Sequence, residues 1–133
     1  MQKIINIIFK VVLSLILVMP ILGTLGIFPA PTPDLYQSAK AFQFIEILMA
    51  VQYINIIMAV VFALAVILLW TKRVALAALL ILPITVNIVA FHLVLDGGLF
   101  TTGAIMADVL LVINIYFLRQ QREYYVALFS KQK

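Results

Sequence analysis

Hydrophobic residues follow one another in long unbroken stretches along this chain. Four stretches are long enough to cross a membrane, and they cover residues 4–27, 53–70, 74–95 and 101–118. A helix of about 20 apolar residues spans the roughly 30 Å hydrocarbon core of a bilayer. The stretches lack the alternation of apolar and polar positions that is typical of membrane β-barrels. We therefore expect an all-α integral membrane protein, a four-helix bundle, with residues 1–133 forming a single domain.

The segment 28–52, between the first two stretches, has a different pattern. Pro29, Pro31 and Pro33 disfavour a helix at its beginning. The pattern predicts that Thr32 is the N-cap of a helix with Pro33 as its first residue. One face of that helix would carry the apolar residues Leu35, Ala39, Phe42, Ile45 and Met49. This predicts an amphipathic helix in the first external loop, either in the outer membrane interface or packed over the mouth of the bundle.

The composition agrees with a membrane protein and excludes several kinds of site. Hydrophobic residues make up 66% of the chain and charged residues 11%, against about half and about a quarter in soluble domains. Without cysteine and with one histidine, the chain has no disulfide and no thiolate site, and a multi-histidine metal site is not expected. It also lacks a phosphate-binding glycine loop and a basic patch suited to nucleic acid.

The basic residues predict the orientation. With the N-terminus in the cytoplasm, only Lys40 falls outside, and eight others lie on the cytoplasmic side: Lys3, Lys10, Lys72, Arg73, Arg119, Arg122, Lys131 and Lys133. This distribution follows the positive-inside rule and places both termini in the cytoplasm. The basic tail 119–133 either bends onto the inner leaflet, with aromatic rings among the lipid head groups, or serves only as a topology signal.

A cluster of polar residues lies at the end of the third stretch, in "NIVAFHLVLDGG", residues 87–98. At about 100° per residue, His92 and Asp96 share a helix face, while Asn87 lies about 140° from His92 and is not expected on that face. We expect His92 to bond to Asp96, Glu46 or a loop carbonyl. It is then either a structural anchor or part of a ligand or proton site, whose candidate residues are His92, Asp96, Glu46 and Asn87.

Two charges fall deeper in the predicted membrane spans. Lys10 lies about 9 Å from the inner edge of the first span, and Asp108 about 16 Å above Arg119 in the fourth. If these spans are neighbours, Lys10 and Asp108 are expected to form an intramembrane ion pair. Alternatively, Lys10 extends to the cytoplasmic surface and Asp108 is protonated or reaches water.

The order of several motifs resembles a known family. "KRVALAALLILP", "ITVNIVAFHLVLDGG" and the terminal "RQQREYY" are similar to the DoxX-like family of small bacterial four-helix membrane proteins. That family is related to the DoxD subunit of thiosulfate:quinone oxidoreductase. The most specific matching positions are Asn87, Phe91, His92, Leu95 and Asp96. The resemblance implies a four-helix bundle in the bacterial inner membrane.

The chain departs from this family where many members carry acidic residues. Phe62 and Val66 occupy that region of the second span, and Asn114 stands at the position in the fourth. We therefore expect a non-catalytic accessory or scaffold subunit without a cofactor of its own. Its partners would be membrane lipids and either other membrane subunits or further copies of the chain. The alternative is a redox accessory protein that binds a quinone or a lipid-like molecule. Four short spans without broken helices disfavour a small-molecule transporter.

Overall fold

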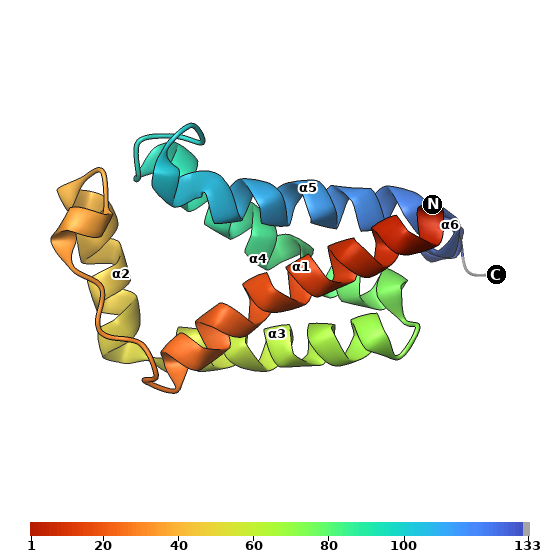
Figure 1. Cartoon of the computed structure of the whole chain (residues 1–133), viewed down its shortest axis with the longest axis horizontal. Helices are drawn as coiled ribbons and strands as arrows, with labels where there is room; N and C mark the ends of the chain where they lie inside the picture. Colours follow the sequence, from red (N-terminus) through yellow and green to blue (C-terminus); the bar gives the residue numbers. More distant parts are fainter. Residues whose placement is uncertain (132–133) are drawn as a thin grey trace.

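Four long helices run alongside one another in the computed structural model, which describes residues 1–131 (Figure 1). They are α1 (Gln2–Thr24), α3 (Tyr53–Trp70), α4 (Val74–Val94) and α5 (Ile105–Gln120). All four are long and apolar enough to cross a membrane, α5 together with the short 3-10 helix η2 (Thr102–Ala104) that precedes it. The predicted all-α bundle with four membrane-spanning helices is confirmed. Lys133, counted among the basic residues of the tail, lies outside the described residues.

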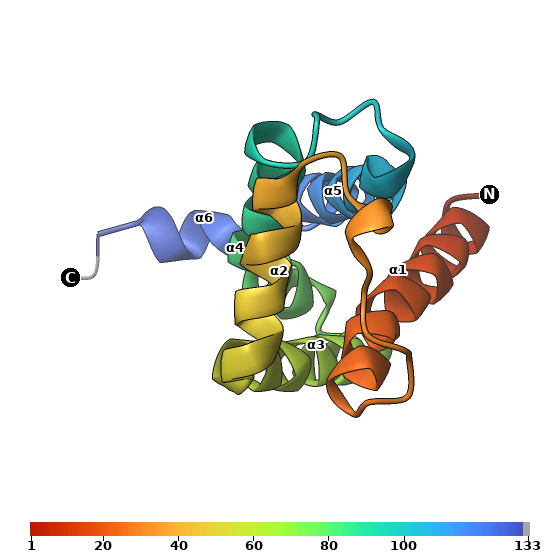
Figure 2. The same cartoon turned by 90° about the vertical axis from the view of Figure 1, so that its left-hand side faces the viewer.

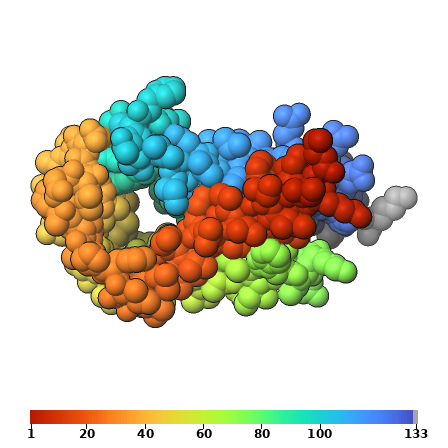
Figure 3. Space-filling model, viewed as in Figure 1, coloured from red at the N-terminus to blue at the C-terminus, as the bar shows by residue number. Residues whose placement is uncertain are grey.

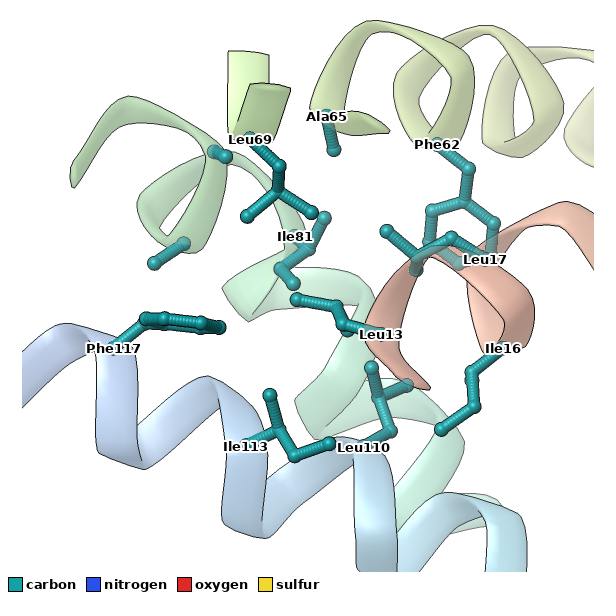
Figure 4. Packing of buried hydrophobic residues seen from close by; sticks show 12 residues of the cluster. Leu13, Ile16, Leu17, Phe62, Ala65, Leu69, Ile81, Leu110, Ile113 and Phe117 are labelled. Carbon is teal, nitrogen blue, oxygen red and sulfur yellow. The ribbon is translucent and has the colours of Figure 1, made fainter. Parts of the chain in front are cut away.

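The core of the bundle lies where the four helices converge (Figure 4). Leu13 and Leu17 of α1 are fully buried there against α3 and α4. Their neighbours from the other helices are also almost fully buried: Phe62, Ala65, Leu69, Ala77, Ala78, Ile81, Leu110, Ile113 and Phe117. Long contacts join α1 to α3, α3 to α4 and α4 to α5, whereas α1 touches α5 over a shorter length. The bundle is therefore less tightly closed between its first and last spanning helices.

The helix bounds follow the prediction closely in the middle of the chain and less closely at its ends. The second spanning helix has the predicted bounds, 53–70. The first ends three residues early, at Thr24, because Gly26 has a φ of +75° and reverses the chain there. The fourth begins as an α-helix four residues late, at Ile105, because the 3-10 turn η2 precedes it.

The first loop contains two helices where the sequence predicted one. Thr32 and Pro33 begin the 3-10 helix η1 (Pro33–Leu35), after which the backbone is extended at Tyr36. The longer helix α2 (Ala39–Val51) starts later, with Ser38 as its N-cap. The Ser38 Oγ accepts a hydrogen bond of 3.0 Å from the backbone amide of Ala41, which satisfies a donor that the helix itself leaves free.

Helix α2 lies across one end of the bundle, transverse to the long helices (Figure 2). We call this the α2 end and the opposite one the α6 end. A sharp corner at Gln52, with a φ of +53°, joins α2 to α3. The side-chain amide of Asn55 donates to the Leu48 carbonyl at 3.1 Å and supports this corner. The structure thus has the loop helix over the mouth of the bundle.

The α6 end carries the chain's last helix and a polar network. Helix α6 (Arg122–Phe129) leaves α5 at a bend at Gln121, and the Tyr125 hydroxyl donates to the Ala75 carbonyl of α4 at 2.8 Å. Burial raises the pKa of the Tyr125 phenol. Nearby, the Tyr116 hydroxyl donates to Asn6 Oδ1 at 2.6 Å and links α5 to α1. The expected bend after the fourth span is present, and its contact with a leaflet stays a prediction.

Candidate functional site

A cavity of about 540 Å³ lies between α2 and the long helices, where the space-filling view is hollowed (Figure 3). Helix α2 forms one wall, and α3 and α4 form the others. Most of its lining is apolar: Pro20, Leu35, Phe44, Ile45, Leu48, Ile54, Met58, Ile84, Ile88, Phe91 and Gly103. The polar side chains that reach it are Tyr36, Asn55, Asn87, His92 and Asp96. The cavity is thus an apolar chamber with a few polar groups.

His92 and Asp96 lie together at the edge of this cavity. The His92 Nδ1 is 3.0 Å from Asp96 Oδ2, and the two side chains are 13% and 2% exposed. The expected contact between them is confirmed. The other carboxylate oxygen, Oδ1, accepts a 2.8 Å hydrogen bond from the backbone amide of Gln37. The link between α4 and the first loop therefore passes from His92 through Asp96.

The glycines after Asp96 make this arrangement possible. Gly97 and Gly98 have φ values of +82° and +101°, a conformation that residues with a side chain rarely adopt. The turn lets the Gly98 amide donate to the His92 carbonyl at 2.8 Å. A Cβ on Gly97 would lie 3.0 Å from the Gln37 Cβ. Glycine therefore both ends α4, as expected, and admits the first loop close to Asp96.

The contact with Asp96 bears on which nitrogen of His92 is free. When the carboxylate is ionised it only accepts hydrogen bonds, so the proton between the two side chains then belongs to the His92 Nδ1. In the neutral ring, Nε2 then carries a lone pair. This nitrogen has no hydrogen-bond partner among residues 1–131 and is not a buried atom. The site therefore offers an acceptor at Nε2 and, when the ring is protonated, a donor.

Asn87 shares the cavity with His92, although the helical angles place the two side chains on different faces of α4. The cavity touches α4 over more than two turns, from Ile84 to His92. A chamber that wraps around the helix contacts side chains well over 100° apart, so residues on different faces meet the same space. No hydrogen bond joins the Asn87 amide to another described residue. Its donors and acceptor are free to meet a ligand.

Glu46 does not belong to this site. It is exposed on α2 and is absent from the cavity lining. The predicted apolar face of this helix is also wrong in part, because Phe44, Ile45 and Leu48 line the cavity, whereas the predicted Phe42 and Met49 do not. The start at Ser38 and the corner at Gln52 set the rotation of α2, and this rotation turns Glu46 away.

Two of the polar lining residues, Asn55 and Tyr36, were not assigned to the site from the sequence. Asn55 stands out only as a polar residue in a span, and Tyr36 carries no local signal because it comes from an irregular loop. The Tyr36 ring packs edge-on to Phe91, with 6.4 Å between centroids. Burial, and secondarily the Asp96 carboxylate, raise the pKa of the Tyr36 phenol above 10.0. The phenol therefore stays a hydrogen-bond donor at neutral pH.

The ion pair expected between Lys10 and Asp108 is not formed within the described chain. Helices α1 and α5 are neighbours, but the two side chains lie on different flanks of α1. The Lys10 Nζ lies 6.0 Å from the centre of the Trp70 ring on α3. Asp108 instead lines a groove between α1 and α5, beside Phe9 and Val12. The Lys10 side chain points to the end of α3, whereas Asp108 lies in the first turn of α5 on the other flank, so both direction and depth separate the charges.

Three residues that the resemblance to the DoxX-like family sets against acidic positions are parts of the core. Phe62 is 1% exposed, and Val66 packs against the core from the side. Asn114 is fully buried, and its amide donates to the Ala78 carbonyl at 2.9 Å. Within residues 1–131, the Asn114 Oδ1 has no hydrogen-bond partner. These residues hold helices together and do not reach the cavity beneath α2.

Comparison with known proteins leaves the function to be argued from this site. No family model, no curated protein and no solved structure matches the chain. Within residues 1–131, no three histidine, cysteine or acidic side chains gather where they would hold a metal ion. The cavity and its polar groups are therefore the observations on which a functional proposal rests.

Proposed function

We propose that this chain is a DoxX-like accessory subunit of a bacterial inner-membrane complex that binds a quinone-like ring beneath α2. The single observation that carries the proposal is the 540 Å³ cavity, whose apolar walls meet the His92–Asp96 pair at one edge. Small-molecule sites typically measure 300–1,000 Å³ and combine apolar walls with a few polar groups. A membrane molecule with a polar ring and an apolar tail has the matching chemistry.

The polar groups suit oxygen atoms on such a ring. The neutral His92 accepts a hydrogen bond at Nε2 from a quinol hydroxyl, and the protonated ring donates to a quinone carbonyl. The Asn87 amide and the Tyr36 hydroxyl are further donors on the cavity wall. The rings of Phe44 and Phe91, 5.7 Å apart between centroids, present aromatic surfaces to a planar ligand. The proposal covers binding and proton exchange at His92, and electron transfer belongs to partner subunits.

The orientation proposed from the charges places this cavity at the outer side of the membrane. Seven of the eight basic residues expected inside lie within residues 1–131. They belong to the first half of α1, the turn between α3 and α4, and the chain from the end of α5 onward. Lys40 lies on α2, across the opposite end of the bundle. Cysteines introduced at position 31 and at position 100, which is fully exposed in the loop after α4, should react with an impermeant thiol reagent added to whole cells, while one at position 131 should not. The reverse labelling pattern would contradict the orientation and would leave the binding proposal standing.

The His92→Leu variant tests the proposed binding mode. The loss of one hydrogen bond of about 1.4 kcal/mol predicts a roughly tenfold weaker affinity for a short-chain benzoquinol. The measurement is the shift in detergent melting temperature as quinol is added, since a ligand that binds only the folded state stabilises it.

Leu93→Ala is the matched control, because Leu93 follows His92 on α4 and is exposed. The melting temperature of this control should rise with quinol concentration as that of the parent does. His92→Leu should also lower the melting temperature without ligand, since it removes the hydrogen bond to Asp96. A parent protein that gains no stability from either quinol or quinone would contradict the proposed function.

A further inference from the structure

A groove runs between α1 and α5, the two neighbouring spanning helices with the shortest contact. Helix α1 crosses the bundle diagonally, from the end of α5 to the start of α3 (Figure 1). The groove consists of two hollows that meet at Val112, an exposed residue that lines both. One hollow is partly polar and lies at the α6 end, and the other is apolar and lies toward the middle of the bundle. Neither shares a lining residue with the cavity beneath α2.

The hollow at the α6 end has a volume of about 500 Å³ and contains an unpaired positive charge. Arg119, in the last turn of α5, is exposed and lines it together with Gln2 of α1 and Gln120. Within residues 1–131, Arg119 forms no ion pair and no side-chain hydrogen bond, and no acidic side chain lines this hollow. The planar guanidinium presents a fork of N–H donors that matches the oxygens of a phosphate. This hollow therefore suits an anionic group.

A hydrogen-bond network fixes the wall beside Arg119. The side-chain amide of Gln2 donates to the Tyr116 hydroxyl at 2.6 Å, and this hydroxyl donates to Asn6 Oδ1 at 2.6 Å. The Gln120 amide donates to the same Asn6 oxygen at 3.0 Å. The second N–H of the Gln2 amide has no acceptor within residues 1–131. The network thus holds the start of α1 against the end of α5 and leaves a further donor in the hollow that Arg119 lines.

The second hollow continues the groove along the bundle with apolar walls. Its apolar lining comes from both helices: Ile8, Phe9, Val12, Val109, Val112 and Ile113. From Arg119 to Val109 the groove follows α5 for about 15 Å, at 1.5 Å per residue. One leaflet has about the same depth, since the hydrocarbon core measures about 30 Å. Asp108 borders only the far end, where an acyl chain that begins at Arg119 would stop.

We propose that this groove binds an anionic phospholipid, with its phosphate at Arg119 and one acyl chain between α1 and α5. Basic pockets between membrane helices bind anionic head groups in this way. A free phosphate would leave the apolar hollow uncovered, and a zwitterionic lipid would bring its own cation close to Arg119. The site lies at a membrane interface in either orientation of the chain, because Arg119 is at the end of a spanning helix. The proposal is independent of the molecule that binds beneath α2.

Two lipids with the same acyl chains test this proposal on the full chain in detergent. Native mass spectrometry with added dioleoyl phosphatidylglycerol and dioleoyl phosphatidylcholine measures the two affinities. We expect the anionic lipid to bind about tenfold more tightly, as one hydrogen-bonded charge contact predicts. Inorganic phosphate at the same concentration should not displace it, because it lacks an acyl chain. Equal affinities for the two lipids, or displacement by inorganic phosphate, would overturn the proposal.

Arg119→Gln tests the position of the head group. This variant should bind phosphatidylglycerol about tenfold more weakly and phosphatidylcholine as the parent does. Arg122→Gln is the matched control, because Arg122 is also exposed at the α6 end but lines neither hollow. Both variants remove one positive charge, so an equal loss of affinity would show attraction by net charge alone and would overturn the site.

Val112→Trp tests the position of the acyl chain. The indole ring would occupy the place where the two hollows meet, and the affinity for phosphatidylglycerol should fall at least about tenfold. Met106→Trp is the control, because Met106 is exposed on α5 and lines neither hollow. Circular dichroism and a single symmetric elution peak establish that each variant folds. A folded Val112→Trp variant that binds the lipid as tightly as Met106→Trp would overturn the proposed binding mode.

Discussion

Asp96→Ala should lower the free energy of unfolding by about 3 kcal/mol and release the first loop from the end of α4. The Asp96 carboxylate is almost completely buried and accepts hydrogen bonds from the Gln37 amide and the His92 ring. Removing it leaves the part-buried Gln37 amide and His92 ring without their acceptor, and a buried donor without a partner costs about 1–3 kcal/mol. Thermal unfolding in a mild detergent measures the stability, and hydrogen exchange of residues 36–42 measures the release of the loop.

Asp34→Ala is the control for this experiment. Asp34 lies in the same loop, within η1, but it is exposed. Surface substitutions of this kind usually change stability by less than about 0.5 kcal/mol. If Asp96→Ala and Asp34→Ala unfold at the same temperature, the carboxylate does not hold the loop, and the shape of the cavity has another cause.

Ile88→Trp should abolish binding beneath α2, with affinity reduced at least about a hundredfold. Ile88 lines the cavity from α4 and is only partly buried, so a larger side chain extends into the open space. The indole ring would occupy the volume that we assign to the ligand ring, and relieving the overlap would cost several kcal/mol. Stability without ligand should change little, because the added ring fills a void and leaves the His92–Asp96 pair in place.

Ile57→Trp is the matched control for the cavity experiment. Ile57 is exposed on α3 and is absent from the cavity lining. The quinol-dependent increase in melting temperature should therefore survive in Ile57→Trp and vanish in Ile88→Trp. Equal responses from the two variants would place any quinol binding elsewhere on the protein.

The spanning helices were predictable because their signal is local. A continuous apolar run sets the length of each span, and the second span is also bounded by Gln52 and by Thr71–Lys72. The first loop was harder, because the sequence predicted Thr32 as the cap, whereas the long helix starts after Ser38. The contact that supports Ser38 is distant in the chain, since its hydroxyl also donates to the Leu95 carbonyl at the end of α4.

The candidate site was predictable only where it lies within one helix. His92 and Asp96 are four residues apart, so the helix alone brings them together. Asn87, also a predicted candidate, lies on the same helix as His92. Tyr36 joins them because the first loop and α2 fold across the bundle, which no local pattern indicates. The failed ion pair between Lys10 and Asp108 has the same origin. Sequence spacing predicts how deep Lys10 and Asp108 lie in the membrane. The side to which Lys10 points depends on how α1 is rotated between α3 and α5, which the spacing does not predict.

Photolabelling by a quinone analogue tests most directly whether the cavity beneath α2 is a binding site. A short-chain azidoquinone would be added to the protein in native membranes and activated by light, and the modified peptides would be identified by mass spectrometry. We expect labels in residues 39–58 and 84–96, from the helices that line the cavity. Excess unlabelled quinone should suppress them, and Ile88→Trp should lack them. Labels confined to the exposed face of α1, or unaffected by competitor and by Ile88→Trp, would contradict the proposal.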